Sequence, residues 1–153
     1  MYPPGGRAGT TFDVQLGGYD WTLDMDYFVL DPRVQLTPLG PPGELLIPPP
    51  PYWFGARSKF PSLPVPREVP ARVTIPADMP PGVVHWQAAN ANGGTATGLF
   101  VVGDGEEIVE VERRKEPQLL PNLPVTVSGR LAKNEEVDEY RIVPSRAGPI
   151  TCE

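Results

Sequence analysis

The sequence predicts an all-β chain that begins with a β-sandwich and has long proline-rich connections. In residues 12–16 apolar and polar side chains alternate, which is the period of a strand with one buried face. Residues 84–88 alternate in the same way, and a glycine-marked turn over 90–94 leads into an apolar strand over 99–102. The chain contains 22 prolines, where average usage would give about eight, and this number excludes a helical bundle because proline breaks helix interiors.

The strands of the first unit can be placed in chain order. A strand over 11–16 ends at a glycine pair, and a second over 21–30 is followed by a turn at Asp31 and Pro32. The pieces 33–36 and 44–47 lie among prolines, which cannot donate to a central ladder, so we expect edge strands or extended coil there. The remaining expected strands are 71–75, 82–90 and 95–102.

A charged segment divides the chain. Residues 104–120 predict a solvated linker, which separates a first domain over 1–103 from a second unit over 121–153. An alternative is that Ile108, Val109 and Val111, which alternate with glutamates, form a strand between the units and stiffen the pair.

The second unit contains two or three strands. Its alternating segments are 125–131 and 137–142, and a further strand begins at 149. So few strands cannot bury an independent core, so we expect an incomplete second β-sandwich.

Two ordered motifs frame the first unit. A proline, a glycine pair and a Gly-Thr step precede its first strand, and a Pro-Gly turn, a strand, an Asn-Gly turn and a phenylalanine-containing strand end it. The opening residues are Pro4, Gly5, Gly6, Gly9 and Thr10, then Phe12, Val14, Leu16 and Gly18, and the closing residues are Pro81, Gly82, Asn92, Gly93, Phe100, Val101 and Val102. These motifs resemble the IPT/TIG domains, and the resemblance implies an immunoglobulin-like β-sandwich for residues 1–103.

A second set of motifs begins inside the charged segment. A Glu-Pro step precedes an alternating strand that ends in glycine, and an acidic turn then ends in Asp-x-Tyr; the residues are Glu116, Pro117, Gly129, Asp138 and Tyr140. This order resembles the opening of the bacterial pre-peptidase C-terminal (PPC) domain. Gln118 and Glu136 stand where that pattern has asparagine and often aspartate, which argues against carrying over a calcium site.

Charge and composition exclude several partners. The net charge is −6 and no basic face is evident, which argues against nucleic acid as a partner and against binding to an anionic membrane. No apolar run is long enough to span a membrane. We expect the targeting signal to lie outside this chain, because the motif after Met1 is typical of the interior of a longer protein. The single Cys152 cannot form an internal disulfide and does not report the compartment.

The residue types that perform catalysis are isolated. His85 lies on the opposite strand face from Trp86, so we expect a surface histidine, and Cys152 is expected to be a small buried side chain near the chain end. Asp13, Asp24 and Asp26 are expected on a solvated face; the alternatives are a calcium site and, third, a carboxylate pair for glycoside hydrolysis. No cofactor-binding motif is present.

The segment PPPPYWF over 48–54 is the most suggestive surface feature. The simplest interpretation is a crossover that pins its aromatic residues over an open end of the sandwich. Alternatively, Tyr52, Trp53 and Phe54 form a platform for sugars or peptides, or the prolines are a ligand for an aromatic groove.

Together the predicted architecture and these two resemblances imply a non-catalytic spacer or adhesion module, which positions neighbouring domains of a multidomain bacterial surface or secreted protein. The expected partners are those neighbouring domains and surface polysaccharide or protein. The alternative is a carbohydrate- or peptide-binding module that uses the exposed aromatic cluster. An enzyme ranks third, because no set of converging catalytic groups is evident.

Overall fold

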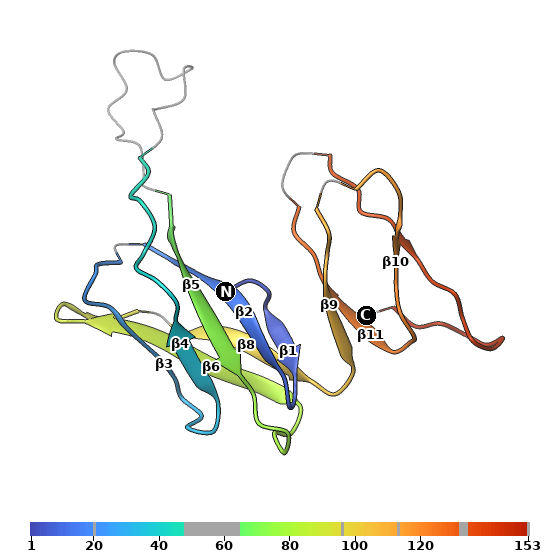
Figure 1. The fold of residues 1–153 in the computed structure, drawn as a ribbon, viewed down its shortest axis with the longest axis horizontal. Coiled ribbons are helices and arrows are strands. Elements are labelled where there is room, and N and C mark those ends of the chain that lie inside the picture. Colours follow the sequence, from blue (N-terminus) through green and yellow to red (C-terminus); the bar gives the residue numbers. More distant parts are fainter. Residues whose placement is uncertain (20, 48–64, 96, 113, 132–134, 153) are drawn as a thin grey trace, which may run out of the picture.

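The computed structural model describes residues 1–19, 21–47, 65–95, 97–112, 114–131 and 135–152 (Figure 1). All regular structure in these ranges is β-strand, which confirms the predicted all-β class, and none of them contains a helix that could cross a bilayer. The strands are β1 Gly5–Arg7, β2 Thr11–Gly18, β3 Asp26–Val29, β4 Gln35–Pro38, β5 Arg67–Thr74, β6 Gly82–Asn90, β7 Gly93–Gly94, β8 Gly98–Gly103, β9 Glu106–Val109, β10 Gln118–Leu119, β11 Val125–Ser128 and β12 Tyr140–Arg141.

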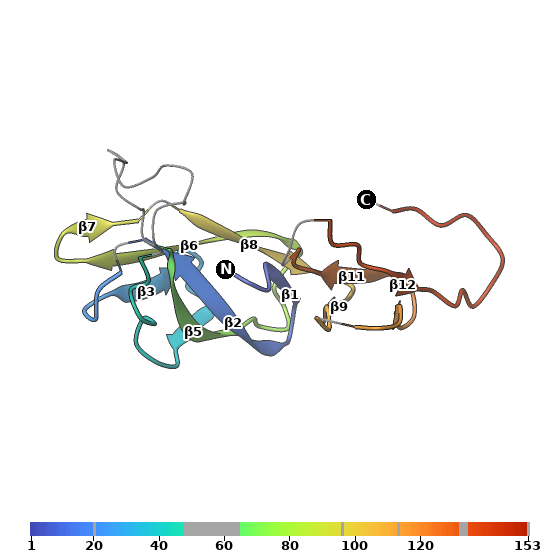
Figure 2. The same cartoon turned by 90° about the horizontal axis from the view of Figure 1, so that it is seen from above.

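The first eight strands form a two-layer sandwich, which Figure 2 shows from above. One sheet has the order β2-β5-β4, and the other has the order β1-β8-β6-β3 with β7 paired to β6. All pairs are antiparallel except β1 and β8, which run parallel. The distribution of strands between two sheets is similar to that of immunoglobulin-like sandwiches, and the predicted β-sandwich is confirmed.

The core lies between the two sheets. Val14 and Leu16 on β2 face Ala71 and Val69 on β5, and all four are buried. The opposite sheet contributes Val84, Trp86 and Ala88 from β6 and Phe100 and Val102 from β8, in one continuous cluster. Because the alternating residues of both sheets share this interior, the period-2 patterns of the sequence predicted it correctly.

The strand expected over 21–30 is much shorter in the structure. The segment 21–30 contains only the short strand β3, because the backbone turns at Thr22–Met25 and leaves Leu23 80% exposed. Trp21 nevertheless enters the core and contacts Tyr27 edge to face, with ring centroids 5.2 Å apart. The segment 44–47 forms no strand, in agreement with extended coil, one of the two expectations for it, and its apolar side chains are exposed.

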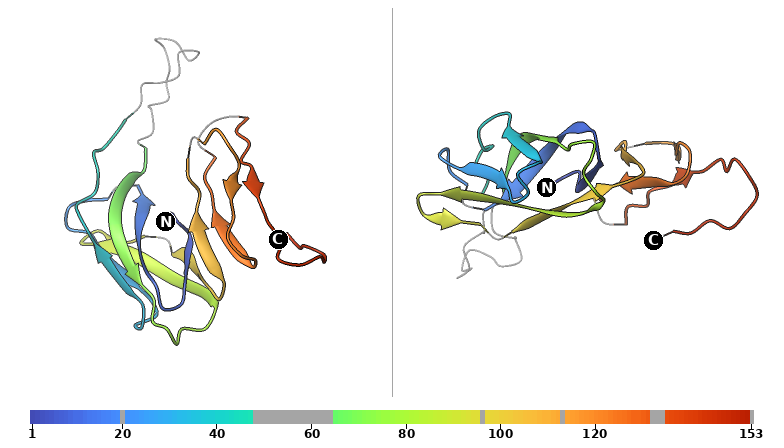
Figure 3. Two further views of the ribbon diagram at one scale, coloured as in Figure 1. Left: turned by 45° about the vertical axis from the view of Figure 1, so that its right-hand side comes forward. Right: turned by 90° about the horizontal axis from the view of Figure 1, so that it is seen from below.

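The second unit lies beside β1 and β8 and is not stacked over either sheet (Figure 3). Strands β9 and β11 pair in parallel, with Ile108 opposite Val127, and β10 pairs in parallel with β12. Part of the expected linker is therefore a strand, because Glu106–Val109 find a partner in Val125–Ser128. The expected strand from residue 149 is not formed over the described residues 149–152.

The second unit leaves most of its large apolar side chains exposed. Parallel sheets are normally covered on both faces, and two-stranded sheets rarely stand alone. The unit therefore consists of two small parallel sheets with little core of their own, and the predicted incomplete second β-sandwich stays a prediction. Its exposed apolar residues are Val109, Val111, Leu119, Leu123, Leu131, Val137, Val143 and Ile150.

Candidate functional site

The predicted aromatic cluster cannot be compared with the structure. Tyr52, Trp53 and Phe54 lie outside the described residues, as does the run of prolines that precedes them. The functions assigned to this segment therefore stay predictions.

Asp13, Asp24 and Asp26 are all exposed, which confirms the expected solvated position. A shared calcium or catalytic site was the alternative prediction, and the structure does not bring the three side chains together. The prediction assumed that the strand of Asp13 is the neighbour of the strand that carries Asp26, but β2 pairs with β5 and β3 pairs with β6 in the opposite sheet. Asp13 instead forms a bidentate ion pair with Arg72 of β5, with N–O distances of 2.7 and 3.0 Å. Across the described ranges, no three histidine, cysteine or acidic side chains gather in a way that could hold a metal ion.

Asp24 lies in the turn before β3, where its carboxylate accepts hydrogen bonds and does not meet the other two carboxylates. A hydrogen bond from the side chain of Thr22, supplemented by backbone hydrogen bonds, holds the pKa of Asp24 below its ordinary value. The charge of this aspartate is therefore satisfied by its own turn and by the backbone of Ala91.

The predicted positions of His85 and Cys152 agree with the structure in one case and not in the other. His85 is exposed on β6 while its neighbour Trp86 is buried, so the predicted surface position is confirmed. Cys152 is exposed and lies in no strand, so the prediction of a buried thiol was wrong. The reason is that residues 149–152 do not join a sheet that could bury it.

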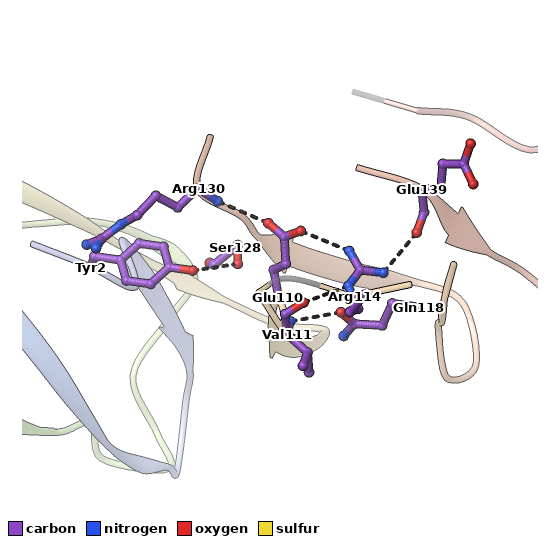
Figure 4. Close-up of polar contacts among 8 residues, drawn as sticks. All are labelled: Tyr2, Glu110, Val111, Arg114, Gln118, Ser128, Arg130 and Glu139. Carbon is purple, nitrogen blue, oxygen red and sulfur yellow. Dashed lines mark hydrogen bonds and ion pairs between the residues drawn. The ribbon is translucent and has the colours of Figure 1, made fainter. Parts of the chain in front are cut away.

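The best-organised polar cluster lies where the two units meet, and we call it the junction network. Figure 4 shows its members, which are Tyr2, Glu110, Val111, Arg114, Gln118, Ser128, Arg130 and Glu139. Glu110 directly follows β9, and its side chain is only 3% exposed. Burial of a carboxylate is costly unless hydrogen bonds compensate it, so the contacts of Glu110 determine whether this arrangement is stable.

Glu110 has such compensation. Its Oε1 accepts a hydrogen bond from Arg114 Nη2 at 2.8 Å, and its Oε2 accepts one from the backbone N–H of Arg130 at 3.1 Å. The carboxylate lies against Gly129, where an added Cβ would be 2.8 Å from Oε2. A glycine at position 129 therefore gives the carboxylate room to reach the backbone of the segment after β11.

Arg114 connects Glu110 to the rest of the second unit. Its Nε donates to the carbonyl of Val111 at 2.7 Å and its Nη1 to the carbonyl of Glu139 at 2.9 Å. The guanidinium also lies 5.1 Å from the centroid of the Tyr140 ring, a cation–π contact. One arginine thus links the segment after β9 to the start of β12.

A second acid shares this environment. The hydrogen bond from Arg114 and then one with Asp138 hold the pKa of Glu110 below its ordinary value. The pKa of Asp138 is raised, first by its hydrogen bond to Glu110 and then by burial. Two carboxyl groups in contact cannot both ionise freely, so Glu110 keeps the negative charge and Asp138 holds its proton to higher pH.

Tyr2 connects the junction network to the sandwich. Its backbone exchanges two hydrogen bonds with Gln15 of β2, at 2.9 and 2.7 Å. Its hydroxyl donates to the carbonyl of Ser128 at 3.3 Å, and the guanidinium of Arg130 lies 4.3 Å from its ring centroid. Tyr2 is therefore held by the first unit and contacts the second unit at two residues.

The sequence patterns did not reveal this network. The run DGEEIVEVERRKE predicts a solvated linker, because nothing local distinguishes Glu110 from the glutamates around it. Its partners include Arg130, twenty positions away, and the final link reaches Tyr2. The only signal was the alternation of Ile108 with glutamates, which favoured a strand over part of this run.

Most contacts of the junction network are made to backbone groups. Its hydrogen bonds and ion pair connect the segments that follow β9 and β11 with the start of β12, and Tyr2 connects Ser128 and Arg130 to the sandwich. Comparison with known proteins adds no family: no family model, curated protein or solved structure matches this chain.

Proposed function

We propose that this chain is a non-catalytic spacer or adhesion module of the IPT/TIG type, followed by the opening of a PPC-type unit. In this proposal it positions neighbouring domains of a multidomain bacterial surface or secreted protein, outside the cytoplasm. The observation that carries the proposal is the junction network, since a spacer must hold its units in a fixed relation.

The connection between the units favours stiffness. Only Asp104 and Gly105 separate β8 from β9, so the chain has little freedom to swing at this point. The contacts of Tyr2 with Ser128 and Arg130 provide a second attachment, from a segment far away in sequence. With both attachments, the second unit cannot rotate freely about the short connection between β8 and β9. A single flexible linker would allow that rotation.

The partners follow from the same proposal. They are the domains on either side in the same polypeptide, together with polysaccharide or protein at the cell surface. The resemblance to IPT/TIG and PPC motifs supports the extracytoplasmic location, and the acidic net charge of −6 is compatible with it.

The test measures the distance between the units. Spin labels at Leu99→Cys on β8 and Leu119→Cys on β10, both exposed positions, are placed in a Cys152→Ser background. Electron–electron double resonance should then give one narrow distance distribution. Glu110→Ala should broaden it, because Arg114 and the backbone of Arg130 lose their common acceptor.

Glu116→Ala is the matched control. It removes the same charge as Glu110→Ala, but Glu116 is exposed and lies outside the junction network. It should leave the distance distribution narrow. A broad distribution in the parent chain would contradict the spacer proposal, since the two units would then move independently.

A further inference from the structure

A cleft of about 310 Å³ lies where the first unit meets the second. Strand β1 and the start of β2 form one side, and β9 with Ser128 of β11 forms the other. Pro3, Phe12 and Ile108 give it apolar walls. Phe12 lies against Gly6, where an added Cβ would be 2.9 Å from Cδ1 of the ring. The glycine thus leaves room for the ring at this wall of the cleft.

Glu107 places a carboxylate between these walls. Its two oxygens lie over glycines of two strands: added Cβ atoms would be 2.5 Å from Oε1 at Gly103 and 3.3 Å from Oε2 at Gly5. The side chain is half-buried, and burial raises its pKa above the ordinary value. Among the residues that the structure describes, no donor forms a hydrogen bond or ion pair with this carboxylate.

The other charged groups along the cleft do not compensate Glu107. Asp13 is paired with Arg72, which occupies both of its oxygens. Arg7 and Glu106 also line the cleft, but both are exposed. The free negative charge inside the cleft is therefore that of Glu107, and desolvation without a partner makes it unfavourable.

From this arrangement we infer that the cleft binds an ammonium or guanidinium group carried on an apolar stem. The cation pairs with the carboxylate of Glu107, and the stem lies along Phe12 and Ile108. A lysine or arginine side chain of a partner polypeptide has this chemistry, and so does a free alkylamine. This inference does not need a spacer role, but it rests on the same placement of the two units, because both line the cleft.

Binding is tested on the full chain by titration with n-butylammonium, followed through backbone amide shifts in ¹H–¹⁵N NMR spectra. We expect saturable shifts at Gly5, Gly6 and Ile108. Glu107→Gln keeps the shape and removes the charge, and it should weaken the affinity about tenfold or more. The matched control Glu116→Gln, which lies outside the cleft, should leave the affinity unchanged.

Neutral and larger probes complete the experiment. n-Butanol has the same apolar stem without the charge and should bind far more weakly than n-butylammonium. N-acetyl-lysine methylamide should bind more tightly than n-butylammonium if the natural partner is a polypeptide, and no more tightly if it is a free amine.

The pH dependence gives a measurement that needs no variant. Because binding requires the ionised carboxylate, affinity should fall as the pH drops through the raised pKa of Glu107. Equal binding of n-butanol, unchanged affinity in Glu107→Gln, or no saturable shift with n-butylammonium would each overturn the inference. Because the cleft is lined by both units, a broad distance distribution would contradict both proposals, whereas failure of n-butylammonium binding with a narrow distribution would overturn this inference alone.

Discussion

Replacing Phe100 with alanine is expected to lower the free energy of unfolding of the sandwich by about 3–5 kcal/mol. Phe100 is 1% exposed and is among the largest fully buried side chains of the described residues. It lies on β8 opposite Val84 of β6 and belongs to the core cluster formed by both sheets. The loss combines the transfer energy of the ring with the cavity that the surrounding side chains cannot fill.

Leu99→Ala is the control for this prediction. Leu99 is the preceding residue on the same strand, but it is 56% exposed, so its replacement should change the stability by no more than about 0.5 kcal/mol. Urea unfolding monitored by tryptophan fluorescence measures both variants. If the two losses were equal, β8 would not present alternate faces to core and solvent, and its register with β6 would be wrong.

The parts of the fold that follow from local alternation could be predicted from the sequence. Val84, Trp86 and Ala88 alternate with polar or exposed residues, and all three are buried in the core. The same holds for Val14 and Leu16 on β2. A strand with one buried face carries its period in its own residues, so no distant contact is needed to detect it.

The second expected strand shows where this information ends. The pattern over 21–30 continues through Leu23, yet the backbone turns there and Leu23 is exposed. Arg67 of β5 donates hydrogen bonds to the carbonyls of Trp21 and Gly43, which holds these two loops together. Contacts between residues so far apart in the sequence do not change the alternation of apolar and polar residues within the segment, so that alternation could not reveal them.

For a related reason the sequence could not decide which polar residues meet in a site. Whether acidic residues on successive strands meet depends on which strands become neighbours, and Asp13 and Asp26 went to opposite sheets. Glu110 likewise became buried because Arg114 and the backbone of Arg130 close around it. Both outcomes depend on the pairing of strands, which the composition of a single segment does not determine.

Gly98→Ala is the second large effect, with an expected loss of about 1–3 kcal/mol in the free energy of unfolding. Gly98 lies directly opposite Trp86 in the pairing of β8 with β6. A Cβ at position 98 would be 2.5 Å from Nε1 of the indole. Trp86 is buried and contacts Trp21 edge to face, with ring centroids 6.4 Å apart, so it has little room to move away.

Gly17→Ala tests whether the loss is steric or is a general effect of replacing glycine in a strand. No atom lies within 4 Å of an added Cβ at Gly17, so this variant should keep the parent stability within about 0.5 kcal/mol. Trp86→Phe should restore part of the stability that Gly98→Ala loses, because the smaller phenylalanine ring leaves room for a Cβ at position 98. In a double-mutant cycle measured by urea unfolding, the double variant should lose less than the two single variants together. Strictly additive losses would mean that the indole is not what excludes a side chain at position 98.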